Sequence, residues 1–275
     1  MITKLKYSDA KSIIKEIPTE GHSPLMVLAD EYDTYFVKSG KGNVPAFDII
    51  NEYLCHYLLH FWSIPTPEIS AVKVDPVLLE GRGFNPIFHN KHHYYQITFG
   101  SKKLNDTFEL GYFNQINGKV DFRKYINPSI FVKIGLFDIW VENTDRKPSN
   151  FNILIQDYNS KLKIYAMDHA FTFNHMSYSD LNPDPNFITN TYNDNILDST
   201  IVKEVIKRLK SSDWINDLLN YFYFCISECE NNFINIVEQI PDELGLSKEL
   251  VVSLQEFLFN KERNKAVFQE FLTRL

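Results

Sequence analysis

One stretch, ENTDRKPSNFNILI at residues 142–155, constrains the fold of this chain more than any other. The residues before it predict a buried helix, because apolar side chains repeat there at helical spacing, at Ile130, Ile134, Phe137 and Val141. Two apolar runs, FNILI and LKIYAM, predict a pair of strands joined by the turn-like QDYNSK. The polar hexapeptide DRKPSN is therefore expected on a loop between a helix and a strand pair.

Oxygen-bearing side chains cluster in this loop and at the end of the strand pair. Asp145 and Asn150 lie in the loop, and Asp168 follows the second strand in AMDHAF. Because a hairpin returns the chain to the side of its start, we expect Asp168 to lie close to Asn150. Two carboxylates and an amide would provide ligands for a hard cation such as magnesium. Phosphoryl transfer needs such a metal, a base that orients the attacking hydroxyl, and a cation on the nucleotide.

The first hundred residues hold candidates for contact with a nucleotide. Lys38 ends the strand YFVK and could supply the cation. Glu52 lies on the helix that follows and could hold Lys38 in place, so we expect an ion pair between the two. The loop TEGHSP, between the first two strands, is placed to cover phosphates with backbone N–H groups.

The pattern of elements predicts an α+β fold in two lobes. The runs SIIKEI, LMVLA and YFVKS predict a three-stranded meander, residues 46–61 a helix, and EISAVKV and YYQITFG two further strands. From Asn127 onward, apart from the strand pair, helical periodicity dominates, with a break near Pro241. We predict a small lobe at residues 1–105, with an antiparallel sheet and one helix, and a larger, mainly helical lobe at residues 106–275.

These motifs together resemble a known family. DRKPSN matches the D-x-K-P-x-N form of the protein-kinase catalytic loop, and Asp168 takes the place of the magnesium-binding aspartate. The wider pattern is similar to the HipA-like kinases, a bacterial family related in fold to protein kinases and phosphoinositide kinases. The resemblance covers roughly residues 20–175 and rests on YFVKSGKG, FDIINEYLCHYLL, IPTPEI, FDIWVENTDRKPSNFNILI and YAMDHAFTF. It implies a protein-kinase-like fold and an ATP-dependent phosphotransferase.

The resemblance implies a role for each matched residue of the catalytic loop. Asp145 would be the catalytic base, and Lys147 would approach the transferred phosphate. Asn150 and Asp168 would bind Mg²⁺. Asn143 stands where protein kinases have a histidine, and His169-Ala170 replaces Phe-Gly after the aspartate. Both replacements are tolerated in HipA-like proteins.

The resemblance also implies the nucleotide contacts. Lys38 would contact the α- and β-phosphates of ATP, with Glu52 as its ion-pair partner. Three residues would line the phosphate loop, namely Gly21, His22 and Ser23, and three would offer backbone contacts to adenine, namely Ile97, Thr98 and Phe99. The phosphate loop has one glycine instead of the three of protein kinases. Members of the family can phosphorylate a serine of this loop, for which Ser23 is the first candidate here and Ser39 the second.

Composition excludes several other classes of function. The formal net charge of −7 argues against direct nucleic-acid binding, which needs clustered Lys and Arg. No apolar run approaches the roughly 20 residues that span a bilayer, and the N-terminus lacks the apolar segment of a signal peptide. The three cysteines have no metal-ligand spacing and are expected to be reduced thiols in a cytoplasmic protein.

Several functions stay open at this level. The leading one is an ATP-dependent HipA-like serine/threonine kinase that acts on a protein hydroxyl. The alternatives are a kinase for a small molecule or lipid head group, and a module that binds nucleotide without turnover. Several HipA-like kinases are toxins that a DNA-binding antitoxin neutralises, so a toxin with an antitoxin partner is a further open alternative. No residue pattern identifies the substrate.

Overall fold

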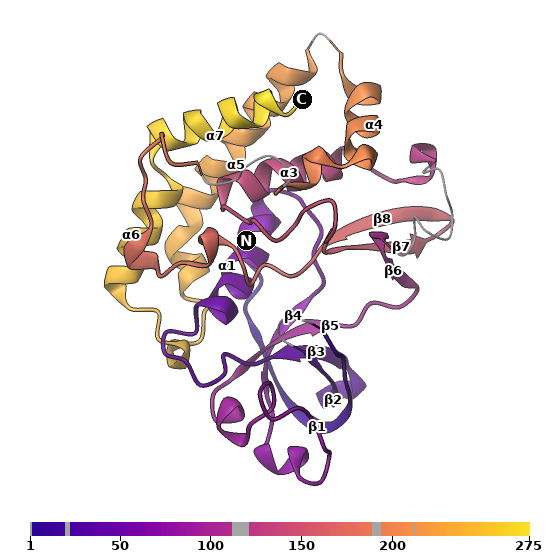
Figure 1. Cartoon of the computed structure of the whole chain (residues 1–275), viewed down its shortest axis with the longest axis vertical. Coiled ribbons are helices and arrows are strands. Elements are labelled where there is room, and N and C mark those ends of the chain that lie inside the picture. Colours follow the sequence, from indigo (N-terminus) through magenta and orange to yellow (C-terminus); the bar gives the residue numbers. More distant parts are fainter. Residues whose placement is uncertain (1, 20–22, 112–120, 189–193, 212) are drawn as a thin grey trace.

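The computed structural model describes residues 2–19, 23–111, 121–188, 194–211 and 213–275, which form an α+β fold (Figure 1). The strands are β1 (Lys6–Glu16), β2 (Leu25–Ala29), β3 (Thr34–Lys38), β4 (Ile69–Lys73), β5 (Thr98–Lys102), β6 (Thr107–Glu109), β7 (Ile153–Tyr158) and β8 (Lys161–Ala166). The helices are α1 (Phe47–Phe61), α3 (Ser129–Trp140), α4 (Thr200–Leu209), α5 (Trp214–Val237), α6 (Lys248–Leu258) and α7 (Lys261–Thr273).

Strands β1 to β5 form a closed barrel in the order β1-β2-β3-β5-β4. All neighbouring strands are antiparallel except β1 and β4, which pair in parallel. The prediction of an antiparallel sheet is wrong at this one pairing. Strand β1 has 11 residues, so residues 6–9 can pair with β4 while residues 10–16 pair with β2. Closure removes the unpaired strand edges that an open sheet would leave.

Two barrel strands differ in extent from the sequence expectation. β1 begins at Lys6, before the apolar run SIIKEI, because its first residues hydrogen-bond to β4. β5 begins only at Thr98, inside the run YYQITFG, whose first residue, Tyr94, ends a 3₁₀ turn at residues 91–94. In this turn Tyr94 is buried, with its hydroxyl oxygen 2.6 Å from Nδ1 of His89. Contacts of this kind leave no periodic pattern in the sequence.

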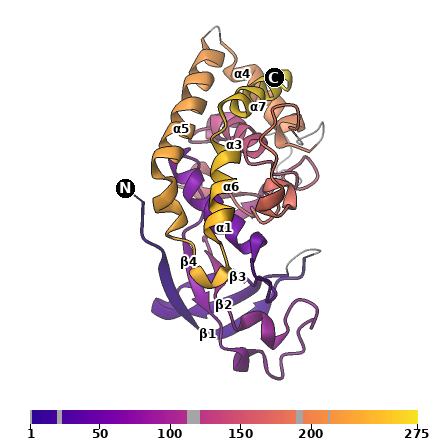
Figure 2. The same cartoon turned by 90° about the vertical axis from the view of Figure 1, so that its left-hand side faces the viewer.

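Helix α1 lies between the barrel and the C-terminal helices (Figures 1 and 2). It packs against α5 on one side and β5 on another. Side chains of α1, α3 and α5 share the main hydrophobic core, whereas a smaller core fills the barrel. The element that carries Glu52 is therefore held by both parts of the molecule.

Helix α3 confirms the predicted buried helix. Its first N–H group, that of Ser129, donates to Oδ1 of Asn127 at 3.2 Å, and Pro128 directly precedes the helix. Apolar side chains lie all around it and nearly all are buried, which is typical of a helix in the centre of a domain. The loop of residues 142–152 begins directly after α3.

A second sheet, in the order β6-β7-β8, holds the other end of that loop. β7 and β8 form the predicted hairpin, with Ile153 opposite Ala166. Beyond this pair, the N–H of Met167 donates to the carbonyl of Asn152 at 3.1 Å. The hairpin therefore brings Asp168 back beside the end of the polar loop.

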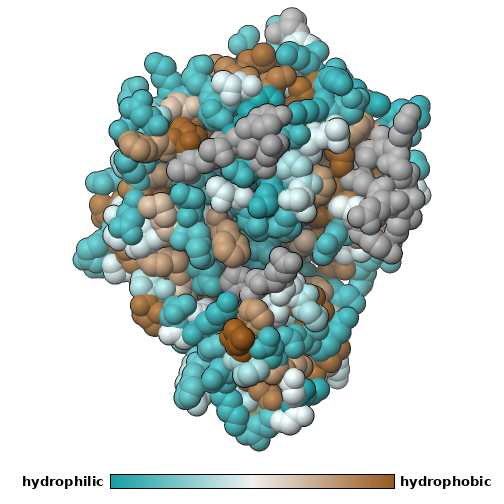
Figure 3. All heavy atoms as spheres, in the orientation of Figure 1, coloured by the Kyte–Doolittle hydropathy of each residue, from teal (hydrophilic) through white to brown (hydrophobic). Residues whose placement is uncertain are grey.

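The surface of one face mixes hydrophobic residues with many hydrophilic ones (Figure 3). Within the described parts of the chain, every helix is too short or too polar to cross a membrane.

Candidate active site

Lys38 is the centre of the candidate site. Its Nζ lies 2.6 Å from Oε1 of Glu52 and 2.7 Å from Oδ1 of Asp168. These three residues come from β3, α1 and the segment after β8, so three separate elements meet at one ammonium group. The ion pair expected between Lys38 and Glu52 is present, and Asp168 joins it.

Burial and charge act in opposite directions on this ammonium group. Burial would lower the pKa of Lys38, but the carboxylates of Asp168 and Glu52 outweigh it and raise the pKa above its ordinary value. Lys38 is therefore a cation throughout the physiological range. A buried cation held by two carboxylates, one of them partly exposed, is well placed to exchange a partner for a phosphate.

Glu52 is fixed from two directions. It is 2% exposed, and its Oε2 accepts the N–H of His169 at 2.9 Å. Asp168 directly precedes His169 and has a left-handed backbone conformation (φ 56°), which aspartate tolerates better than most residues. The carboxylate of Asp168 can therefore point at Lys38 while the next amide points at Glu52.

The carboxylate of Asp145 is held by two amides. Oδ2 accepts Nδ2 of Asn150 at 3.0 Å and Nδ2 of Asn152 at 2.9 Å, while the N–H of Asp145 donates to Oδ1 of Asn143 at 3.2 Å. The backbones of Lys147 and Asn150 close a tight turn, with N–H to carbonyl distances of 3.0 and 2.9 Å. Asn152 is a contact that the motif did not indicate, because it lies two residues beyond it.

A buried arginine, Arg146, joins this loop to the segment of Asp168. Its guanidinium pairs with Asp138 on α3, donates to the carbonyl of Met167 at 2.6 Å, and lies 3.0 Å from Nε2 of His169. Asp138 also accepts Nδ2 of Asn143 at 3.1 Å. Neither Arg146 nor Asp138 was predicted as a site residue. The one signal for them in the sequence is an aspartate in a mostly apolar helix.

The predicted phosphate loop lies only partly within the described residues. Gly21 and His22 lie outside the described residues. Ser23 is 3% exposed, and its hydroxyl donates to the carbonyl of Thr19 at 3.1 Å. Ser39, the second candidate for self-phosphorylation, is 7% exposed. Either hydroxyl would need a local opening before it could be phosphorylated.

The residues expected beside adenine, Ile97 to Phe99, are buried where β5 begins. The N–H of Ile97 donates to Oε1 of Glu243 at 3.2 Å, and the carbonyl of Thr98 accepts the Tyr53 hydroxyl at 3.0 Å. These two backbone groups are thus engaged within the protein. Phe99 lies opposite Lys38 in the β3–β5 ladder, which places this stretch close to the candidate site.

The donor set fits a magnesium–nucleotide complex. Nδ2 of Asn150 donates to Oδ2 of Asp145, which leaves Oδ1 as the atom of this amide that could bind a cation. The side chain of Asp168 is 34% exposed and within reach of a cation. In the described part of the chain, no group of three His, Cys, Asp or Glu side chains could hold a metal. Mg²⁺ in kinases typically takes one or two protein carboxylates and completes its shell with phosphates and water.

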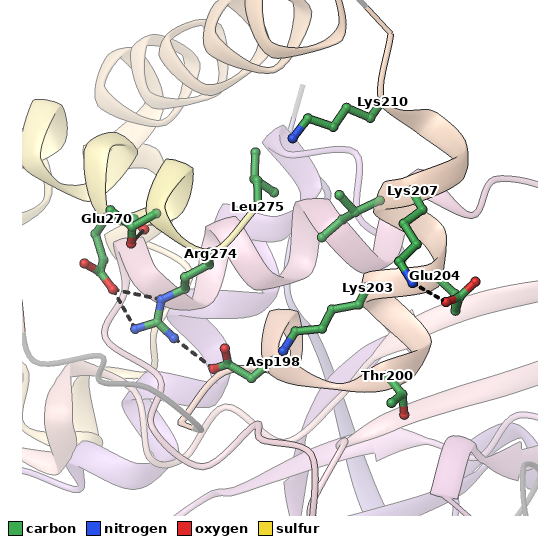
Figure 4. A pocket seen from close by; sticks show the side chains of 11 residues that line it. Asp198, Thr200, Lys203, Glu204, Lys207, Lys210, Glu270, Arg274 and Leu275 are labelled. Atoms are coloured by element: carbon green, nitrogen blue, oxygen red, sulfur yellow. Dashed lines mark hydrogen bonds and ion pairs between the residues drawn. The ribbon is translucent and has the colours of Figure 1, made fainter.

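A surface cavity of about 660 Å³ lies elsewhere, between α4 and the C-terminal end of α7 (Figure 4). Lysines of α4 line one side. Arg274 lines the other and pairs with Asp198 at 3.1 Å and Glu270 at 2.7 Å. None of the predicted site residues lines this cavity, so it is separate from the candidate active site.

Comparison with known proteins agrees with this geometry. A model of the HipA-like kinase family matches residues 10–265, and the chain therefore belongs to that family of kinases. Among solved structures, the Helicobacter pylori proinflammatory kinase CtkA has a similar fold, with a TM-score of 0.54 over 98% of this chain and 99% of that chain. Sequence identity to it is 11%, so the likeness shows the fold alone. No curated protein sequence matches significantly.

Proposed function

We propose that this protein is an ATP-dependent kinase that phosphorylates a serine or threonine hydroxyl of a protein, with Mg²⁺ as its metal. The observation that carries the proposal is the pairing of Lys38 with both Glu52 at 2.6 Å and Asp168 at 2.7 Å. A structural ion pair would need one carboxylate. A second, partly exposed carboxylate on the same ammonium group is suited to a site that opens toward phosphates and metal.

Each residue then has a chemical task. Asp145, with Oδ2 fixed by two amides, would orient the attacking hydroxyl and accept its proton. Lys38 would bind the phosphates, and Asn150 and Asp168 would hold the metal. Magnesium, when bound, neutralises charge on the phosphates during transfer. We assign residues 1–105 to a nucleotide-binding lobe and residues 106–275 to a catalytic lobe, with this site between them.

Two substitutions separate the roles of the carboxylates. Asp168→Asn removes a charge that would bind the metal, so the affinity for Mg-ATP should fall about tenfold or more. Asp145→Asn should leave that affinity within a few-fold of wild type while transfer falls by about two to four orders of magnitude. Calorimetry with Mg-ATP and a phosphoryl-transfer assay measure both. Equal loss of binding in the two variants would refute the assignment, and normal transfer by Asp145→Asn would exclude Asp145 as the base.

The substrate class needs its own experiment. Phosphoproteomics of cells that express wild type or Asp145→Ala should show serine or threonine sites that depend on the wild type. If labelled phosphate from ATP enters only small molecules or lipids of a lysate, the protein-kinase proposal is wrong and the alternative kinase class holds.

A further inference from the structure

One face of α1 is attached to the segment that follows Asp168. Phe47, Asn51 and Cys55 repeat at intervals of four residues and share a face of the helix, with Glu52 beside them. All four contact the segment: Glu52 accepts the N–H of His169, and the Cys55 thiol lies 3.6 Å from Oγ1 of Thr172. The ring of Phe47 lies against that of Tyr178, with centroids 4.7 Å apart.

Asn51 makes the most contacts in this interface. It is 1% exposed, and its Nδ2 donates to the carbonyls of Ala170 at 2.9 Å and Thr172 at 3.2 Å. Its Oδ1 accepts the hydroxyl of Tyr178, which is fully buried. Both donors and the acceptor of one amide are thus used on a single segment. An aliphatic side chain of similar size could fill the space, but the Ala170 carbonyl and the Tyr178 hydroxyl would lose the partner that Asn51 provides, and the Thr172 carbonyl would keep only the N–H of His175.

The helix itself is fixed by the C-terminal part of the chain. Before its first residue, the N–H of Ala46 donates to the carbonyl of Leu244 at 2.9 Å. After its last residue, the carbonyl of Trp62 accepts the hydroxyl of Tyr221. Contacts at both ends leave α1 little freedom to swing, so a segment attached to α1 is also held in place.

We infer that Asn51 is a positioning residue that keeps Asp168 directed at Lys38, so that the site is assembled before a nucleotide binds. The inference rests on the proposed function. Asp168 lies two residues before Ala170, the first backbone group that Asn51 holds, and Glu52 holds the amide between them. Without Asn51, the segment would keep the His169–Glu52 bond and the long Cys55–Thr172 contact as its polar attachments to α1 among the described residues.

The test compares Asn51→Leu with a matched variant, Asn195→Leu. Asn195 is also a fully buried asparagine whose amide bonds two backbone groups, Gly135 O and Leu197 N, each at 2.9 Å, but it lies beside α3. ATP affinity is measured by calorimetry with Mg²⁺ and with EDTA. The ratio of the two affinities reports how well Asp168 is placed for the metal, and a general loss of stability does not change it.

We expect the Mg²⁺-dependent gain in ATP affinity to fall about tenfold in Asn51→Leu and to stay at the wild-type value in Asn195→Leu. Tyr178→Phe removes one hydrogen bond and should produce a change of a few-fold in the same direction, which keeps the test decisive if Asn51→Leu does not fold. An unchanged ratio in Asn51→Leu, or in Tyr178→Phe when that is the variant that folds, overturns the inference. If wild type shows no Mg²⁺-dependent ATP binding, the proposed function itself fails.

Discussion

Arg146, in the loop of residues 142–152, is fully buried. Burying a guanidinium costs several kcal/mol of desolvation, which is recovered only when its donors are paired. Here Asp138, the Met167 carbonyl and His169 provide partners. Burial raises the pKa of Asp138 to about 7, although Arg146 and Asn143 act against this rise. Loss of either Arg146 or Asp138 alone would therefore leave the other buried without its charged partner.

Removing the guanidinium of Arg146 alone should strongly destabilise the folded protein. Arg146→Met leaves Asp138 buried without its partner, so we expect the free energy of unfolding to drop by about 3–5 kcal/mol. Loss of Arg146 raises the pKa of Asp138 further, so ionisation of this carboxyl above pH 7 destabilises the folded variant more than wild type. The loss of stability relative to wild type should therefore be larger at pH 8.5 than at pH 6. Urea unfolding at both pH values measures it.

The double variant Arg146→Met, Asp138→Leu should recover most of the loss, because no buried charge remains. A double variant that is no more stable than Arg146→Met would show that the two residues do not form an energetic pair.

At the scale of elements, α3 packs closely against the turn at residues 196–198. Gly135 permits this approach: a Cβ at that position would lie 2.5 Å from Cγ of Leu197 and 2.9 Å from Oδ1 of Asn195. Both neighbours are buried and cannot move freely. The glycine is therefore required for packing, despite its cost to helix stability.

Gly135→Ala should destabilise the protein by about 1–3 kcal/mol, because overpacking outweighs the gain of roughly 1 kcal/mol in helix propensity. Thermal unfolding would show a lower Tm. Gly111→Ala is the control, since the nearest described atom to its Cβ lies 3.9 Å away. A Tm at or above that of wild type for Gly135→Ala would mean that α3 can shift at no cost.

At the scale of the whole molecule, α1 connects the barrel with the C-terminal helices, and a histidine lies within it. Burial lowers the pKa of His56 to about 4, and Nδ1 of its ring lies 2.7 Å from Oγ1 of Thr66. The unfolded chain would bind a proton at this ring near pH 6.5, whereas the folded chain does not. Stability from this group is therefore complete above pH 6.5 and decreases as the pH falls toward 4.

Wild type should lose about 1–3 kcal/mol of stability through His56 between pH 6.5 and pH 4. His56→Gln cannot take up that proton, so its stability should fall less steeply over the same range. Parallel pH profiles of the two proteins in urea unfolding would exclude His56 as a source of acid sensitivity.

Local patterns in the sequence were sufficient for much of the fold and the site. Helical spacing identified α1 and α3, and the two apolar runs after the polar loop identified the β7–β8 hairpin. The ion pair expected between Lys38 and Glu52 is present, whereas the contact of Asp168 with Lys38 was not predicted. The elements were predicted from periodicity, and the site residues from motifs that resemble those of a known family. Both kinds of signal are visible in the linear sequence.

Contacts between distant residues were decided only by the tertiary structure. The parallel pairing of β1 with β4 closes the barrel across some sixty residues. Asn51 reaches carbonyls about 120 residues away, and Arg146 finds Asp138 and Met167 from different elements. A buried polar group is stable only where its partners converge on it, and that convergence depends on how the elements pack. The sequence alone thus determined most of the elements and the main residues of the candidate site, while packing decided which buried side chains hold them in place.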